Sequence, residues 1–277
     1  MAGFDMHIHS IASDGGWSAE EIIDAAIAKG LDGIAITDHD TVGGLKAAMS
    51  YGEKCNFPVI PGIELSTKHD GRDIHVLGYW IDADAIEADG RLRELREARE
   101  QRCYKIVARL DTLGMKLDAD AIIAAAGSCD SIGRPHIAKA MVEAGYVDNI
   151  KEAFVKWIGQ GMPAYVPRMK MTPFEAAKRI MDAKGAAVLA HPGVGVPDYL
   201  IGRLVKQGIV GIEAYHPEHK IADEKKYLQI SRRFHIAVTG GSDFHSIGLR
   251  CIGYRVAALS QVELLARLRQ QRLAIND

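Results

Sequence analysis

Residues 4–15 read FDMHIHSIASDG, an alternating apolar run that breaks off into His7, His9 and Asp14. Alternation of apolar and polar residues is typical of a half-buried strand, here over residues 4–8. Side chains two residues apart share one face of a strand, so His7 and His9 are expected to point the same way. The stretch therefore predicts a first strand that carries two imidazoles to its carboxyl end.

Strand and helix signals alternate along the chain beyond this point, which is typical of parallel α/β architecture. Two capping boxes, Ser18–Glu21 and Thr172–Glu175, predict helix starts, the second with Pro173 at the first helical position. The first strand is not followed by the G-x-G-x-x-G of a dinucleotide-binding fold. Seven strand–helix units favour a closed or nearly closed barrel over an open sheet. The further strands are expected at residues 33–40, 57–65, 72–80, 186–192, 209–215 and 235–245.

A stretch without strand signals interrupts this alternation between residues 85 and 158. It contains helical segments such as RLRELREAREQRCYKIVARLDTLG (91–114) and IAKAMVEAG (137–145). Long insertions in such folds commonly form lids or binding walls. We therefore expect a barrel made of residues 1–84 and 159–277, with residues 85–158 as a helical insertion that covers the substrate.

Composition excludes several classes of partner. The chain has 277 residues, with 34 Lys and Arg against 36 Asp and Glu, so no basic surface for long nucleic acid or for a membrane is expected. Its four cysteines lie far apart and show no C-x-x-C spacing, which predicts free thiols in a reducing compartment. No apolar run is long enough for a membrane span and no signal peptide is evident, so a cytoplasmic location is expected.

Imidazoles and carboxylates gather at the predicted strand ends. In α/β barrels the carboxyl ends of the strands carry the active site, so these groups should converge. Such a ligand set suits Zn²⁺, Mn²⁺ or Fe²⁺, and the absence of nearby cysteines argues against a closed structural zinc site. Glu64 could bridge two ions, whereas His75 stands early in its strand and fits the rule less well. The residues at the strand ends are His7, His9, Asp38, His39, Glu64, His191, Glu213, His216, Asp243 and His245.

Other histidines have a simpler interpretation. A single histidine near a strand end is usually a surface residue or a hydrogen-bonded core residue. We therefore expect structural roles for His69, His219 and His235.

Five motifs occur in order: HIH (7–9), TDH (37–39), GIE (62–64), HP (191–192) and SDFH (242–245). They resemble the PHP (polymerase and histidinol phosphatase) superfamily of metal-dependent phosphoesterases. The resemblance covers most of the chain and implies a distorted (β/α)7 barrel with a helical insertion. It also implies hydrolysis by in-line attack of a metal-bound hydroxide, with no serine or cysteine nucleophile.

The resemblance further implies two or three divalent ions per chain, with Mn²⁺ expected and Zn²⁺ or Fe²⁺ as alternatives. Glu64 would be the bridge, and Glu64 and Asp243 would hold the hydroxide. Asp14 stands where some members have histidine, a departure at the second site. The implied ligand sets are His7, His9, Glu64 and Asp243 for the first ion, Asp14, His39 and His245 for the second, and Glu64, His75 and His191 for the third.

The predicted insertion contains SIGRPHIAKAMVEAGY (131–146), with Arg134 and His136 near a helix start. This looks like the subgroup that includes nucleoside 3′,5′-bisphosphate phosphatases and related RNA exonucleases. The planar fork of arginine suits phosphate, although an ordinary surface arginine is the alternative interpretation. Arg134, His136 and His216 are the expected substrate-binding residues.

The expected activity is hydrolysis of the 3′-phosphate of nucleoside 3′,5′-bisphosphates, with a small phosphorylated nucleotide as the partner. Three alternatives stay open: a 5′-3′ exoribonuclease on short 5′-phosphorylated RNA, a histidinol-phosphate phosphatase, and a non-catalytic metal-binding module.

Overall fold

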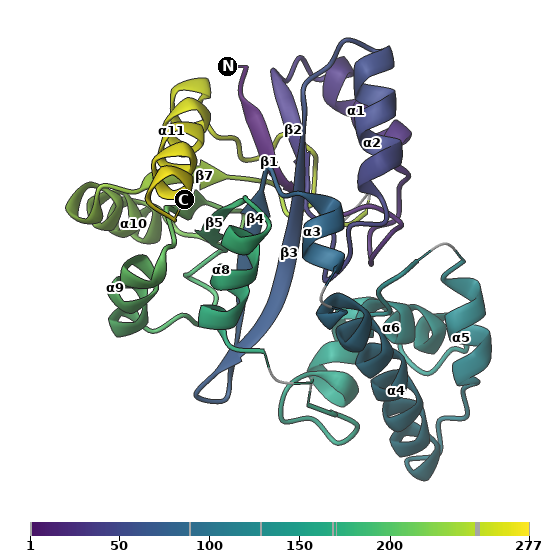
Figure 1. The fold of residues 1–277 in the computed structure, drawn as a ribbon. Helices are drawn as coiled ribbons and strands as arrows, with labels where there is room; N and C mark the ends of the chain where they lie inside the picture. Colours follow the sequence, from purple (N-terminus) through teal and green to yellow (C-terminus); the bar gives the residue numbers. More distant parts are fainter. Residues whose placement is uncertain are drawn as a thin grey trace.

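Seven strands form one barrel-shaped, nearly closed sheet with helices around it (Figure 1). The computed structural model describes residues 2–88, 90–127, 129–167, 169, 171–246 and 250–276. The strands lie side by side in the order in which they follow along the chain. They are β1 (Phe4–Ile8), β2 (Gly33–Ile36), β3 (Val59–His69), β4 (Arg72–Tyr79), β5 (Ala186–Leu189), β6 (Gly211–Tyr215) and β7 (Ala237–Gly240).

The first strand, β1, lies next to the residues that follow the last strand, β7. Ile8 forms a parallel bridge with Phe244, which follows β7. The backbone N–H of His9 also donates to the carbonyl of Phe244 at 2.9 Å. These contacts confirm the predicted nearly closed barrel and bring the residues after β7 next to those at the end of β1.

The prediction of a parallel sheet is wrong at one strand. β4 runs antiparallel to both β3 and β5, whereas the other neighbouring pairs are parallel. The cause is the Asp70–Gly71 turn between β3 and β4, where both residues have positive φ, 47° and 77°. Asp-Gly is a strong signal for a two-residue hairpin turn, because both central positions of that turn need positive φ.

This reversal explains the position of His75 early in its strand. Because β4 runs backwards, its first residues lie beside the carboxyl-terminal part of β3. His75 pairs with Ser66 and lies diagonally across from Glu64, which pairs with Leu77. The amino-terminal half of β4 therefore carries His75 to the end of the barrel where the other strands end.

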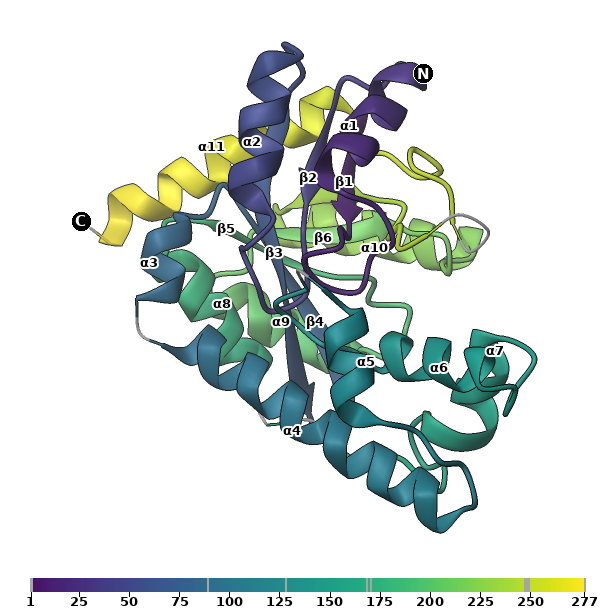
Figure 2. The same cartoon turned by 90° about the vertical axis from the view of Figure 1, so that its right-hand side faces the viewer.

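Helices cover the outside of the sheet (Figure 2). The capping boxes predicted at Ser18 and Thr172 are both present. No helix in the described ranges combines the length and the apolar character that crossing a bilayer requires, and all four cysteines are free. The helices around the barrel are α1 (Ala19–Ala28), α2 (Leu45–Lys54), α8 (Pro173–Asp182), α9 (Asp198–Gln207), α10 (Ile221–Phe234) and α11 (Leu259–Asn276).

Between β4 and β5 the described residues form helices and no strand, and α4, α5 and α6 stand apart from the barrel helices in Figure 1. They pack around a buried cluster of their own that includes Ile106, Leu110, Ile137, Met141 and Ile158. The boundaries at residues 85 and 158 stay a proposal. Apart from α8, which belongs to the barrel, the helices between β4 and β5 are α3 (Ala83–Glu87), α4 (Arg91–Thr112), α5 (Ala119–Ala125), α6 (Arg134–Glu143), α7 (Ile150–Ala153) and the π-helix η1 (Phe154–Ile158). The phrase 'the helices between β4 and β5' refers to these six below.

Candidate metal centre

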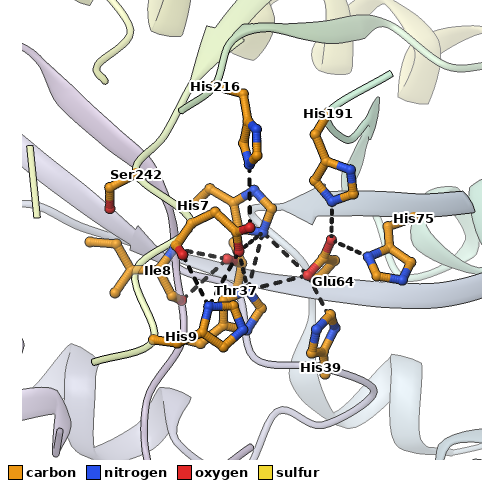
Figure 3. A network of polar contacts seen from close by, with 12 residues as sticks. His7, Ile8, His9, Thr37, His39, Glu64, His75, His191, His216 and Ser242 are labelled. Atoms are coloured by element: carbon orange, nitrogen blue, oxygen red, sulfur yellow. Dashed lines mark hydrogen bonds and ion pairs between the residues drawn. The ribbon is translucent and has the colours of Figure 1, made fainter. Parts of the chain in front are cut away.

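Polar side chains from several strands meet at one end of the barrel, around Glu64 (Figure 3). His7 and Glu64 lie within β1 and β3, and His9 and Asp243 follow shortly after β1 and β7. All four residues are at most 9% exposed. The barrel therefore brings residues from opposite ends of the chain into one buried polar cluster.

His7, His9, Glu64 and Asp243 each offer one ligand atom within 4.8 Å of the others. The Nε2 atoms of the two histidines are 3.1 Å apart, and each lies 3.2 Å from Glu64 Oε2. Asp243 Oδ1 is 3.4 Å from His7 Nε2 and 3.2 Å from His9 Nε2. Atoms about 2.0–2.2 Å from a shared ion would lie roughly 2.8–3.6 Å apart, so the four atoms fit one divalent cation.

Glu64 is the centre of the cluster, because its two oxygens face different imidazoles. Oε2 lies 3.1 Å from His39 Nδ1 as well as 3.2 Å from His7 and His9. Oε1 lies 2.7 Å from His75 Nδ1 and 3.1 Å from His191 Nε2. A carboxylate whose oxygens point at separate sets of nitrogens is suited to bridge two ions.

A second cluster consists of His9, Asp14, His39 and His245, again with ligand atoms within 4.8 Å. Asp14 Oδ1 lies 3.4 Å from His245 Nε2 and 4.0 Å from His9 Nδ1. Asp14 Oδ1 and His9 Nδ1 are buried without a hydrogen-bond partner among the described residues. Since buried polar atoms are normally paired, these two fit a site that holds a cation.

The third cluster contains His39, Glu64 and His75. The set that the family resemblance implies has His191 where this cluster has His39. His191 nevertheless contacts Glu64 Oε1, so it lies beside the same carboxylate oxygen as His75. Every residue proposed as a metal ligand from the sequence therefore lies in or directly beside these three clusters.

Glu213 contacts His7 of the first cluster on the side of the ring that faces away from Glu64, a role that the sequence did not reveal. Its Oε1 lies 3.0 Å from His7 Nδ1, and its Oε2 accepts the backbone N–H of His191 at 2.7 Å. A carboxylate on the outer nitrogen of a ligating histidine fixes the orientation of the ring and increases its basicity. Glu213 lies within β6, and its partner His7 could be known only from the fold.

Two further residues brace the loops that carry ligands. Asp38 accepts hydrogen bonds from the backbone and hydroxyl of Ser10, at 2.8 and 2.7 Å, and from the hydroxyl of Ser13 at 2.6 Å. Arg250 donates to the outer oxygen of Asp243 and to Glu218. Asp243 has a left-handed φ of 48°, a costly conformation that surrounding contacts such as these must maintain.

The three residues proposed to bind substrate lie in different surroundings. His216 Nε2 is 3.2 Å from Asp243 Oδ2, directly beside the first cluster. His136 Nδ1 accepts the backbone N–H of Gly133 at 3.1 Å and so caps α6. The Arg134 guanidinium lies over the rings of Phe154 and Tyr165, 5.3 and 5.7 Å from their centroids.

The remaining histidines make structural contacts. His219 accepts the N–H of Gly193 at 3.0 Å and lies 2.9 Å from the carbonyl of Ala214. His235 is the residue after α10, with a left-handed φ of 53°. His69 packs edge-on against Phe174 at 5.7 Å.

A small cavity of about 140 Å³ opens onto the clusters. Binding sites for whole small molecules are usually about 300–1,000 Å³. This cavity therefore suits a phosphoryl group, and a larger substrate would extend beyond it. Its lining includes His39, Glu64, His75, His191, His216 and Asp243.

The charges of the clusters are strongly coupled. Burial opposes a charge on His9, but Asp243 and Glu64 outweigh burial and raise its pKa to about 10. The pKa of His7 is also raised well above its usual value, because Glu213 and Glu64 outweigh burial. Burial likewise opposes ionisation of Glu64, yet His39 and His75 hold its pKa well below the usual range. The protein without ions therefore holds protonated imidazoles at neutral pH.

We expect binding of a divalent ion to displace at least one proton from this cluster, because only neutral imidazole is a ligand. The apparent association constant should then rise at least about tenfold per pH unit between pH 6 and 8. Calorimetric titration of ions in two buffers with different ionisation enthalpies measures the protons released. Equal heats in the two buffers at pH 6 and at pH 8 would show that ion binding releases no proton, and would contradict this expectation.

The barrel and its clusters of buried imidazoles and carboxylates define a class, the metal-dependent hydrolases. A model of the PHP domain matches residues 5–251, so the chain belongs to the PHP family. The protein is accordingly a metal-dependent phosphoesterase.

Three relatives of known activity differ in what they hydrolyse. The chain is 32% identical to a 3′,5′-nucleoside bisphosphate phosphatase of Chromobacterium violaceum, over 90% of this chain and 89% of the relative. It is 29% identical to a phosphoribosyl 1,2-cyclic phosphate 1,2-diphosphodiesterase of Eggerthella lenta, over 92% and 99% of the two chains. It is 30% identical to a 5′-3′ exoribonuclease of Haemophilus influenzae, over 87% and 89%.

The fold is also found in a solved structure from Bifidobacterium adolescentis, which is provisionally named a metal-dependent phosphoesterase. That structure superimposes with a TM-score of 0.90 at 28% identity and covers 96% of each chain. The similarity therefore extends through the barrel and the helices between β4 and β5.

Proposed function

We propose that this protein removes the 3′-phosphate of nucleoside 3′,5′-bisphosphates and leaves the 5′-monophosphate. The observation that carries the proposal is the position of Glu64, whose two oxygens face separate sets of imidazoles. The relative from Chromobacterium violaceum, which acts on these compounds, supports the choice of substrate.

In this proposal the first ion is held by His7, His9, Glu64 and Asp243. A second ion is held by Asp14, His39 and His245, with His9 beside it. A third is held by Glu64 and His75, with His191 or His39. Mn²⁺ is the proposed ion, because imidazole together with carboxylate suits it.

Bound divalent ions would supply the chemistry, since they lower the pKa of water and neutralise charge on phosphoryl oxygens. The chain's own residues position the reacting groups. Glu64 and Asp243 line the cavity, where the nucleophile would be held. His216 contacts the outer oxygen of Asp243, and Glu213 orients His7.

The 5′-phosphate would bind to Arg134. Burial lowers the pKa of this guanidinium, and it has no carboxylate within 4.0 Å in the described part of the chain. Its Nη1 donates a hydrogen bond to the carbonyl of Ile158, at 3.3 Å. A partly desolvated cation with aromatic neighbours is suited to an anionic ligand, and its fork can hold a phosphate with two hydrogen bonds.

We expect Arg134→Ala to lower kcat/KM for a nucleoside 3′,5′-bisphosphate by about 10- to 100-fold, because a hydrogen bond to a charged group contributes about 1.5–3 kcal/mol. The loss for a 3′-mononucleotide should be smaller, because that substrate has no 5′-phosphate. Steady-state phosphate release from both substrates measures the ratio.

Arg93→Ala is the matched control, since Arg93 is an exposed arginine of α4 whose ion pair with Glu97 has an N–O distance of 3.9 Å. It should leave both substrates unaffected. An unchanged preference for the bisphosphate in Arg134→Ala would remove Arg134 from the substrate site.

Short 5′-phosphorylated RNA is the second candidate substrate, supported by the exoribonuclease of Haemophilus influenzae. It carries the same 5′-phosphate beside a phosphodiester. A screen of the Mn²⁺-loaded protein against bisphosphates, 5′-phosphorylated oligoribonucleotides, cyclic phosphates and histidinol phosphate would rank the candidates. Preference for any substrate other than the bisphosphate would overturn the proposed activity.

A further inference from the structure

The helices between β4 and β5 are tied to the barrel by a buried ion pair. Arg99 of α4 donates to Asp40 Oδ2 through Nε at 2.8 Å and through Nη2 at 2.5 Å. The side chains of Arg99 and Asp40 are 6% and 2% exposed. An ion pair this buried depends on precise geometry, because both charges have lost their water.

Asp40 is joined to the loop and the strand that carry ligands. It follows His39 directly and has a left-handed φ of 53°. Its N–H donates to the carbonyl of Glu64 at 3.0 Å, and its Oδ1 accepts the N–H of Ser66 at 2.8 Å. Arg99 also donates to the hydroxyl of Ser66 at 2.9 Å. One guanidinium thus fixes the position of His39 relative to Glu64.

The same arginine reaches the segment that precedes α6. Its Nη1 donates to the carbonyl of Ile132 at 3.3 Å. Next to Ile132, Gly133 packs so closely on Asp14 that a Cβ at this position would lie 3.1 Å from Asp14 Oδ2. The N–H of Asp130 donates to the carbonyl of Ala12 at 2.9 Å. The inserted helices therefore contact both loops that carry Asp14 and His39.

The first cluster depends much less on these helices. His7 and Glu64 lie within strands of the barrel, and His9 and Asp243 are held by the contact between the ends of β1 and β7. Damage to the Arg99 contact should therefore affect the second cluster and spare the first.

We propose that Arg99 is a positioning residue for the second ion site, which couples occupancy of that site to docking of the helices between β4 and β5 onto the barrel. The inference rests on the ion sites of the proposed function. The coupling acts through Asp40 and through residues 129–134, all of which the structure describes. It requires the planar fork of arginine, because a single lysine ammonium cannot reproduce the contacts to Asp40, Ser66 and Ile132 together.

The test compares Arg99→Met and Arg99→Lys with wild type in calorimetric Mn²⁺ titrations, with elemental analysis of bound ions. Both variants should retain the first ion at wild-type affinity and bind the second about 10- to 100-fold more weakly, the usual effect of losing an outer-shell contact. Arg99→Lys should be the less affected. Loss of both ions, or wild-type binding of both, would overturn the proposal.

Arg96→Met is the matched control, because Arg96 lies one turn earlier in α4 and makes a two-bond pair with Glu87, at 2.7 and 3.1 Å. This variant also loses an arginine–carboxylate pair from the same helix, but one that touches no ion cluster. It should bind both ions like wild type. A weakened second ion in Arg96→Met would assign the effect to loss of helix stability.

A measurement on the wild-type protein covers the case in which an Arg99 variant fails to fold. Coupling is reciprocal, so occupancy of the second site must stabilise docking of the helices. Amide hydrogen exchange in α4 and in residues 129–134 should slow on addition of the second equivalent of Mn²⁺. Exchange that does not respond to the second ion would contradict the proposal.

These readouts do not use phosphate release. If the loaded protein fails to hydrolyse any bisphosphate, the proposed function falls while the coupling of Arg99 to the second ion can still be confirmed. If the bisphosphate is hydrolysed and Arg99→Met binds ions normally, only the coupling falls.

Discussion

Glu64→Gln is expected to lower kcat/KM for phosphate release by at least about 1,000-fold, or about 4 kcal/mol of transition-state stabilisation. The substitution keeps the size of the side chain and removes the charge that two ions would share. Glu64 approaches five imidazoles, whereas Asp243 approaches four. Steady-state kinetics measure the loss of kcat/KM, and elemental analysis of the same preparation measures the loss of bound ions.

Glu213→Gln is the matched comparison, because Glu213 is an equally buried carboxylate that touches His7 from the side away from Glu64. Its loss should cost about 10- to 100-fold, as is usual for a partner of a ligating histidine. If Glu64→Gln kept wild-type ion content and near-normal turnover, the bridging role of Glu64 would be wrong.

Removal of divalent ions by chelation should abolish phosphate release, and Mn²⁺ should restore it. Among the described residues, the cavity lining contains no serine or cysteine, which favours activated water as the nucleophile. Bound ions also stabilise the fold, by about 2.7 kcal/mol when the free ion is at 100 times its Kd. Chelation should therefore lower Tm by roughly 5–10 °C for a chain of this size.

Differential scanning calorimetry and a phosphate-release assay on the same chelated sample check both parts. A related compound that does not bind divalent ions, added at the same concentration, controls for other effects of the reagent. Full turnover in a sample shown by elemental analysis to be free of metal would contradict the requirement for ions.

Much of the fold could be predicted from the strand ends. Most of the strands are short and apolar and end near a polar motif, so the seven strands and the convergence of their ends follow from periodicity and from barrel architecture. The alternation of strands and helices alone does not predict the reversed direction of β4, which follows from the Asp70–Gly71 turn. That local signal was present, and it would also have accounted for His75.

The residues that brace the site were harder to predict. Glu213 acts through His7 and Arg99 acts through Asp40, partners that lie 206 and 59 residues away in the sequence, whereas Arg250 acts through Asp243, 7 residues away. No periodicity links such pairs, because their contacts arise from the packing of whole elements. Motif spacing therefore predicts which residues converge at the strand ends, and predicts their supporting partners poorly.

The most direct test of a bridged ion centre is stepwise addition of Mn²⁺ to metal-free protein, with bound ions and hydrolysis of a nucleoside 3′,5′-bisphosphate measured at each step. We predict little turnover up to one ion per chain and a steep rise as the second ion binds, with 5′-monophosphate as the product. Maximal turnover with fewer than one ion per chain, or no turnover at full occupancy, would contradict a bridged centre.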